Sequence, residues 1–143
     1  MRQERYVGFE IKALSNLLRR RLWNPTEHPE GMLTEIEGVL IGFLCHNQDR
    51  EIYQKDLEAA FCIRSSTASR LLKRLEDQGL IARSMGDKDA RLKRITATPK
   101  AVALTQEAER RIAATEAALT RGISREEIEC FLATVEKLKA NLM

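Results

Sequence analysis

The sequence is poor in the residues that most often build catalytic and metal sites. Its 143 residues include only two histidines and three cysteines. The cysteines are far apart and form no CxxC pair, which argues against a zinc site or a disulfide framework and favours a reducing cytoplasm. His46 directly follows Cys45, and adjacent residues on a helix point in different directions. We expect no metal, no cofactor and no enzymatic activity.

Long apolar runs and aromatic residues are also scarce. No apolar run approaches the roughly 18 residues that cross a membrane, and the first ten residues mix charges without the apolar core of a signal peptide. Aromatic residues make up 5% of the chain and hydrophobic residues 43%. The core is therefore expected to consist of Leu, Ile, Val and Ala. The sequence predicts one cytoplasmic domain without a transmembrane helix.

Positive charge is concentrated in one part of the chain. The net charge is +3, but residues 64–100 hold ten Lys or Arg against four Asp or Glu, and the remainder carries a net charge of −3. A localised basic patch suits a polyanion such as nucleic acid. On charge alone, an ordinary solvated surface explains the pattern equally well.

Apolar spacing and turn residues predict four helices, a hairpin and two further helices. Capping boxes mark two helix starts, at Thr34 and Ser124. Gly79 is expected to end the fourth helix in the left-handed conformation, and Pro99 suits the first turn of the fifth. In the short third helix we expect Leu57, Ala60 and Phe61 to face inward. The last helix is expected to bury Ile128, Phe131, Leu132, Val135, Leu138 and Leu142.

The fourth helix begins, unusually, with small hydroxyl residues, in RSSTASRLLKRLEDQGL. Ala68 and three leucines recur at helical spacing and predict one buried face. The opposite face carries Ser65, Ser66, Ser69, Arg70 and Lys73. Taken alone, this is also what a solvated, capped helix start would look like.

Two helices joined by a tight turn and followed by a hairpin describe a winged helix-turn-helix. The second helix of such a unit enters the DNA major groove, which is only about 12 Å wide and so requires a slim polar tip. We expect Arg70 to bind a guanine edge or a phosphate, Thr67 a thymine methyl or a phosphate, and Lys73 a phosphate.

The predicted hairpin tip is GDKDA, followed by Arg91. Arg91 fits the negative potential of the minor groove, and Asp89 is placed to hold it by a charge-assisted hydrogen bond. Lys88, Lys93 and Arg94 either contact phosphates or only solubilise the turn. The alternative for Asp89 and Arg91 is a surface ion pair of little energetic value.

The motifs SSTASRLLKRLEDQGLIAR and DARLKRITATPKA, which follow QKDLEAAF in that order, resemble the MarR (multiple antibiotic resistance regulator) family of bacterial transcription factors. The resemblance covers essentially the whole chain. It implies a mostly α fold with a small β-hairpin wing, dimerised through residues 1–30 and 101–143, with a DNA-binding lobe at 34–100. It matches Ser66, Thr67, Ser69 and Arg70 to the recognition-helix contacts, and Arg91 with its partner Asp89 to the wing tip.

Three positions depart from the family pattern. Arg64 stands where a capping serine is common, so that Ser65 is the expected substitute. Ala97 replaces the usual leucine of the second wing strand and leaves less to bury, and Ala101 replaces a common glycine. None of these changes removes an expected DNA contact.

The sequence thus predicts a homodimeric repressor that binds a palindromic double-stranded operator. By the family resemblance, a small lipophilic or phenolic effector releases it. One alternative is a winged-helix adaptor that binds protein, because a fold alone does not fix function. Another is a redox-responsive regulator acting through Cys62, whose thiolate Arg64 and the helix N-terminus would favour. The commoner role for such a cysteine is a small buried side chain.

Overall fold

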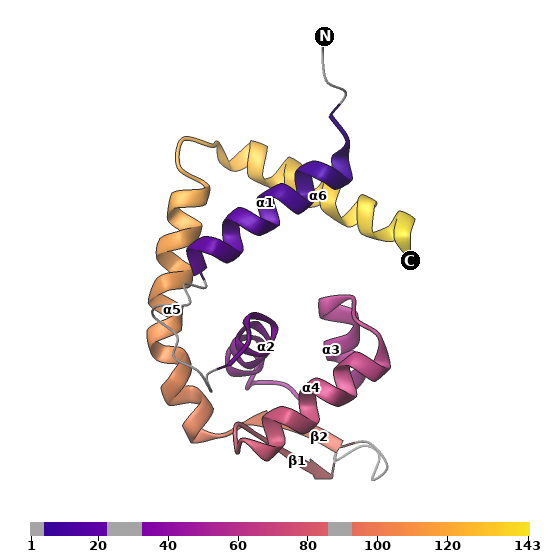
Figure 1. Cartoon of the computed structure of the whole chain (residues 1–143), viewed down its shortest axis with the longest axis vertical. Coiled ribbons are helices and arrows are strands. Elements are labelled where there is room, and N and C mark those ends of the chain that lie inside the picture. The colour runs from indigo at the N-terminus through magenta and orange to yellow at the C-terminus, as the bar shows by residue number, and fades with distance from the viewer. Residues whose placement is uncertain (1–4, 23–32, 86–92) are drawn as a thin grey trace.

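The computed structural model describes residues 5–22, 33–85 and 93–143. Within these residues the predicted order of elements is confirmed (Figure 1). The elements are α1 (Val7–Leu22), α2 (Glu35–His46), α3 (Gln54–Phe61), α4 (Ser65–Asp77), β1 (Ile81–Met85), β2 (Lys93–Ala97), α5 (Pro99–Leu119) and α6 (Arg125–Leu142). The mostly helical fold with a two-stranded wing is therefore as the sequence predicts.

Elements α2, α3, α4, β1 and β2 form one lobe around an aliphatic core. The antiparallel strands pair Ile81 with Ala97 and Arg83 with Ile95. On its other edge β2 donates a hydrogen bond from Ile95 N to Ile52 O, at 2.7 Å. The buried core consists of Leu40, Ile41, Leu44, Ile52, Leu57, Leu71, Leu72, Leu75, Leu80, Ile81, Ile95 and Ala101. This core makes the lobe a rigid support for whatever its surface binds.

The junction between the wing and α5 is fastened to the end of α4. Gly79 ends the α4 turn with a φ of 73°, as predicted. Thr98 caps α5 by accepting a hydrogen bond from Ala101 N, and its own hydroxyl donates to Gly79 O at 2.7 Å. Lys100 donates to Gln78 O at 3.0 Å. These bonds satisfy carbonyls that the end of a helix leaves open.

The terminal helices lie apart from this core. α5 runs from the lobe along one side of the protomer, and α1 and α6 lie beyond the lobe, where they overlap in this view (Figure 1). Neither α1 nor α6 contains a buried residue. The prediction that α6 buries its apolar face is therefore wrong for the single protomer, in which Phe131 is 53% and Leu132 55% exposed. The spacing identified an apolar face, but within the described residues Ile128, Val135 and Leu138 of that face are only half-buried.

The short helix α3 gives a smaller correction. Leu57 is buried and Phe61 half-buried, as predicted, but Ala60 is exposed. Phe61 instead packs edge-on against Phe43 of α2, with ring centroids 5.5 Å apart. This contact turns α3 so that Ala60 faces solvent.

Candidate nucleic-acid interface

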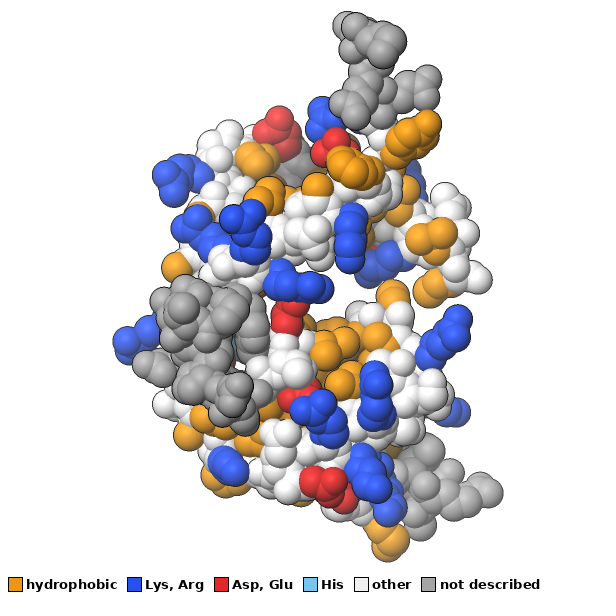
Figure 2. All heavy atoms as spheres, viewed as in Figure 1, with side chains coloured by type: hydrophobic (Ala, Val, Ile, Leu, Met, Phe, Trp, Pro, Cys, Tyr) orange, Lys and Arg blue, Asp and Glu red, His pale blue; other side chains and the backbone are white. Residues whose placement is uncertain are grey.

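The two predicted faces of α4 are both present. Ala68 and the three leucines are buried, while the opposite side chains are exposed over the whole length of the helix. The exposed set is Ser65, Ser66, Ser69, Arg70 and Lys73, and Thr67 is half-buried between the two faces. Figure 2 shows Lys and Arg side chains gathered over the part of the lobe that α4 and the strands form. The tip of α4 thus presents small hydroxyl groups within a basic surface.

Gln54, the first residue of α3, holds the tip of α4 in place. Its side-chain amide Nε2 donates to Ser69 Oγ at 3.0 Å and to the backbone oxygen of Ser65 at 3.3 Å. Ser69 Oγ is thereby an acceptor within the protein, which leaves its own proton available to an outside acceptor. Sequence reasoning missed Gln54, because the contact joins residues 15 positions apart on two helices.

The start of α4 differs from the expectation. Arg64 occupies the cap position without a side-chain capping bond, and Ser65 is the first helical residue. Ser65 therefore does not substitute for the missing cap, because its side chain stands one position too late to reach the open N–H groups. Gln54 fastens this end of the helix from outside.

Cys62 joins α3 to the segment before α4 with a left-handed backbone, at a φ of 52°. Residues other than glycine adopt this conformation at some cost in strain. The thiol is exposed and its sulfur lies 3.8 Å from Ala59 O. The expectation of a small buried cysteine is therefore wrong, and a redox role for Cys62 stays a prediction.

The wing strands follow α4 in the chain, and β1 packs against α4. Lys93 is exposed on β2, and Arg83 of β1 forms an ion pair with Glu76 of α4 at 2.9 Å. This ion pair holds the wing against α4. The predicted site residues Lys88, Asp89 and Arg91 lie outside the described residues.

Comparison with known proteins places this geometry in a family. The sequence model of the MarR family matches residues 43–93. The transcription regulator MarR from Oenococcus oeni PSU-1 is 30% identical, with a TM-score of 0.80 over 95% of this chain and 99% of that chain. The chain belongs to the MarR family. The predicted resemblance is confirmed, and with it the expectation that this transcription regulator is not an enzyme.

More distant MarR-type structures share the fold. Staphylococcus aureus MepR in its DNA-binding conformation has a TM-score of 0.85 at 24% identity, over 97% of this chain and all of that chain. The MepR–DNA complex has a TM-score of 0.83 at 24% identity, over 96% of this chain and 97% of that chain. Both matches extend over the terminal helices as well as the winged lobe.

In this MarR-family lobe, a buried carboxylate connects α2 to α4. Glu37 is fully buried and accepts a hydrogen bond from Thr34 N at 3.2 Å, which closes the predicted capping box. Its other oxygen lies 3.2 Å from Nε of Arg74, near the end of α4. A charge buried so completely is tolerated only when it is paired, so Arg74 and Glu37 fix α4 against α2.

No group of three or more His, Cys, Asp or Glu side chains in the described part of the chain is arranged to hold a metal ion. No helix in it is long and apolar enough to cross a membrane.

Proposed function

We propose that this MarR-type DNA-binding regulator is a homodimeric repressor that binds a palindromic operator in the cytoplasm. One observation carries the proposal: α4 exposes its hydroxylated, basic face along its whole length while the leucine face is buried. A helix so presented has the slim polar tip that major-groove entry requires.

On this proposal, each side chain of the α4 tip has a chemical role. Ser69 accepts from Gln54, so its hydroxyl donates to an acceptor on DNA, such as guanine O6 or N7 or a phosphate oxygen. Arg70 forks onto a guanine edge or a phosphate, and Lys73 binds a phosphate. Ser65, Ser66 and Thr67 complete the contacts to phosphates and base edges.

The wing supplies a second contact. Arg91 enters the minor groove, Asp89 orients it, and Lys88 and Lys93 bind the flanking phosphates. The exposed Lys93 and the ion pair between β1 and α4 support this assignment, because the pair holds the wing strands against α4.

Homodimerisation is supported by the apolar surface of the terminal helices. Phe9 of α1 is 72% exposed, and Phe131 and Leu132 of α6 are about half exposed. Apolar groups on helices this long favour burial against another surface. We assign residues 1–30 and 101–143 to the dimer interface and 34–100 to the DNA-binding lobe, with the two lobes on successive turns of one face of the duplex.

We further propose that a small lipophilic or phenolic effector binds between the dimerisation helices and the lobe and releases the repressor. This part follows from membership in the family. Binding there would change how the two lobes are spaced, and a duplex of fixed pitch accepts only one spacing.

Fluorescence anisotropy with labelled fragments, including the promoter of the protein's own gene, tests the proposal. Arg70→Ala and Arg91→Ala should each weaken operator binding by about 1–3 kcal/mol if they read a base, and affinity should fall steeply with salt. Arg125→Ala, on the exposed surface of α6, is the matched control and should bind as the parent does.

Unchanged affinity in both variants would refute the assigned roles. A flat salt profile would contradict phosphate-driven binding. If no double-stranded fragment binds while a protein partner does, the adaptor alternative replaces the proposal.

A further inference from the structure

Met85, the last residue of β1, exposes an apolar side chain on the wing. It is 71% exposed, whereas the other exposed large hydrophobic residues in the described part of the lobe, Ile36 and Val39 on α2, are 37% and 48% exposed. Its partner on β2 is the exposed Lys93. A single exposed apolar side chain is ordinary on a protein surface, so its surroundings decide whether it has a role.

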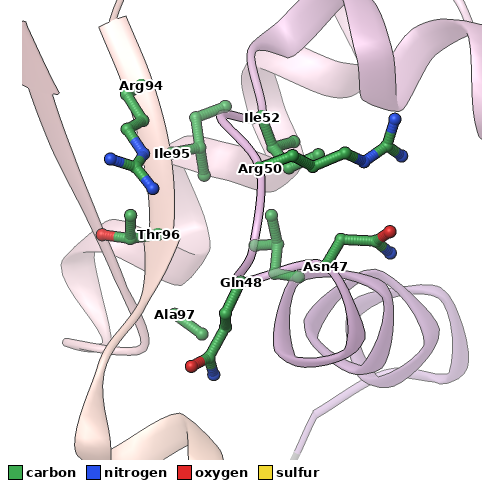
Figure 3. Close-up of a pocket in the computed structure, with 9 residues that line it drawn as sticks. Asn47, Gln48, Arg50, Ile52, Arg94, Ile95, Thr96 and Ala97 are labelled. Atoms are coloured by element: carbon green, nitrogen blue, oxygen red, sulfur yellow. The ribbon is translucent and has the colours of Figure 1, made fainter. Parts of the chain in front are cut away.

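The two faces of the wing hairpin differ in their surroundings. Successive side chains of a strand point to opposite faces, and directly paired residues share a face. One face therefore holds three pairs, which are Ile81 with Ala97, Arg83 with Ile95, and Met85 with Lys93. Figure 3 shows this division on β2, where Arg94 lies across the strand from Ile95 and Ala97. Met85 is thus on the face that is buried against the core at the root of the wing.

This face of β1 meets α4 on the stripe of the helix that carries Ser69. Arg83 forms its ion pair with Glu76 of α4 at 2.9 Å. Glu76 follows Ser69 by seven residues and Lys73 by three, and these spacings place side chains on one side of a helix. In Figure 1, β1 leads back below α4 from the end of that helix, and the two elements pack against each other. Met85, two residues beyond Arg83 on the same face, therefore extends the exposed surface of α4.

The chemistry of Met85 and Lys93 matches the backbone of a duplex. Along that backbone, anionic phosphates alternate with deoxyribose rings whose carbon atoms are apolar. Directly opposite residues of two antiparallel strands have Cβ atoms about 4.5–5.5 Å apart, so an ammonium group on a phosphate brings the thioether to the neighbouring sugar. Methionine is flexible and polarisable, and it adapts to irregular apolar surfaces of this kind.

We propose that Met85 packs against the deoxyribose next to the phosphate that Lys93 binds, between the groove that α4 enters and the groove that the wing tip enters. Contacts to sugars position a protein on DNA without reading a base. The contact carries no charge, so it releases no counterion and adds nothing to the salt dependence of binding. This assignment rests on the proposed operator function and adds one residue to it.

Nuclear magnetic resonance of protein labelled with ¹³C at its methionine methyl groups tests the contact directly. The chain has four methionines, and Met85→Leu assigns the signal of Met85. When a duplex selected from random DNA for binding to the parent is added, we expect this signal to shift and to show nuclear Overhauser effects to deoxyribose protons. Met143, which is 91% exposed after α6, is the internal control, and its signal should not shift.

Affinities for the same duplex over a range of salt concentrations separate this contact from ionic ones. Met85→Ala should weaken binding about three- to tenfold without changing the slope of log affinity against log salt. Met85→Leu, which is apolar and of similar volume, should bind as the parent does. Lys93→Ala should weaken binding and also reduce the slope by about one. Val39→Ala, which trims an exposed apolar side chain on α2, is the matched control and should bind as the parent does.

Circular dichroism melting shows whether each variant is folded. A Met85 signal that does not shift while the duplex is bound would overturn the contact, as would equal affinities of Met85→Ala and the parent. A salt slope that falls in Met85→Ala as it does in Lys93→Ala would also overturn it, because Met85 would then act by placing the lysine. In each of these cases Arg70→Ala tests the operator function separately, and a parent that binds no duplex would overturn both proposals.

Discussion

The winged lobe and the terminal helices differ in how far they bury their apolar side chains. The lobe buries a continuous set of leucines and isoleucines and even a charged residue, Glu37. The terminal helices α1 and α6 contain no fully buried residue, and their Phe9, Phe131 and Leu132 are exposed. The core of the lobe is thus buried within one protomer, whereas the large apolar side chains of the terminal helices remain exposed in it.

On the proposed function, this difference separates two tasks. The lobe has to hold the α4 tip in a fixed geometry, so its packing must not depend on association. On that proposal, the terminal helices set the distance between two lobes, and their apolar faces are available for a second protomer. The variants described below each test the lobe, the terminal helices or both.

The largest effect is expected from a cavity in the lobe core. Leu72→Ala removes a fully buried side chain and should lower the free energy of unfolding by about 2–5 kcal/mol. Chemical denaturation at one fixed protein concentration measures this loss. Leu142→Ala, at the exposed end of α6, should change the free energy of unfolding by less than about 0.5 kcal/mol. Equal losses in both variants would contradict the difference between the lobe and the terminal helices.

A charge on the terminal helices should affect association rather than folding. Leu132→Glu places a carboxylate on the apolar face of α6 and should raise the dimer dissociation constant by about 100-fold. Analytical ultracentrifugation measures this change, and circular dichroism should show an intact lobe. A variant that stays dimeric at concentrations at which the parent begins to dissociate would place the dimer interface elsewhere.

Two ion pairs, one in each region, allow a direct comparison of what such a pair contributes to stability. Arg74→Ala leaves the buried Glu37 without its cation and should cost about 1–3 kcal/mol of unfolding free energy. Arg125→Ala breaks an exposed pair with Glu129 on α6 and should cost less than about 1 kcal/mol. Thermal and chemical denaturation of the two variants side by side check this order, and a reversed order would contradict the assigned burial.

The smallest effect concerns the positioning of Ser69. Gln54→Ala should weaken operator binding by about 1 kcal/mol, the typical value of one hydrogen bond, without changing stability by more than that amount. The loss should shrink when Ser69 is already alanine, in a double-mutant cycle. Additive losses would mean that Gln54 acts on DNA independently of Ser69.

Much of this organisation could be predicted from local sequence signals. The caps at Thr34 and Ser124, the left-handed Gly79 and the leucine face of α4 depend on neighbours within one or two helical turns, and all are present. Contacts between elements could not be predicted in this way. The bond from Gln54 to Ser69 depends on the angle between two helices, and local spacing does not specify that angle.

The terminal helices also show that local spacing does not predict contacts between separate elements or molecules. Apolar spacing along α6 identifies which side chains share a face, but it does not say which molecule covers that face. For the same reason, Ser65 was the obvious replacement cap by residue type but lies one position inside the helix. Residue type alone gave no indication that Gln54 fastens the helix start instead.

Selection of bound duplexes from random DNA, followed by measurement of the stoichiometry on the selected site, tests the central claim most directly. We expect a two-fold symmetric sequence with half-sites about 10 bp apart, or a multiple of that spacing, bound by two protomers. A selected site without symmetry, one protomer per duplex, or no enriched sequence at all would contradict the paired-lobe account.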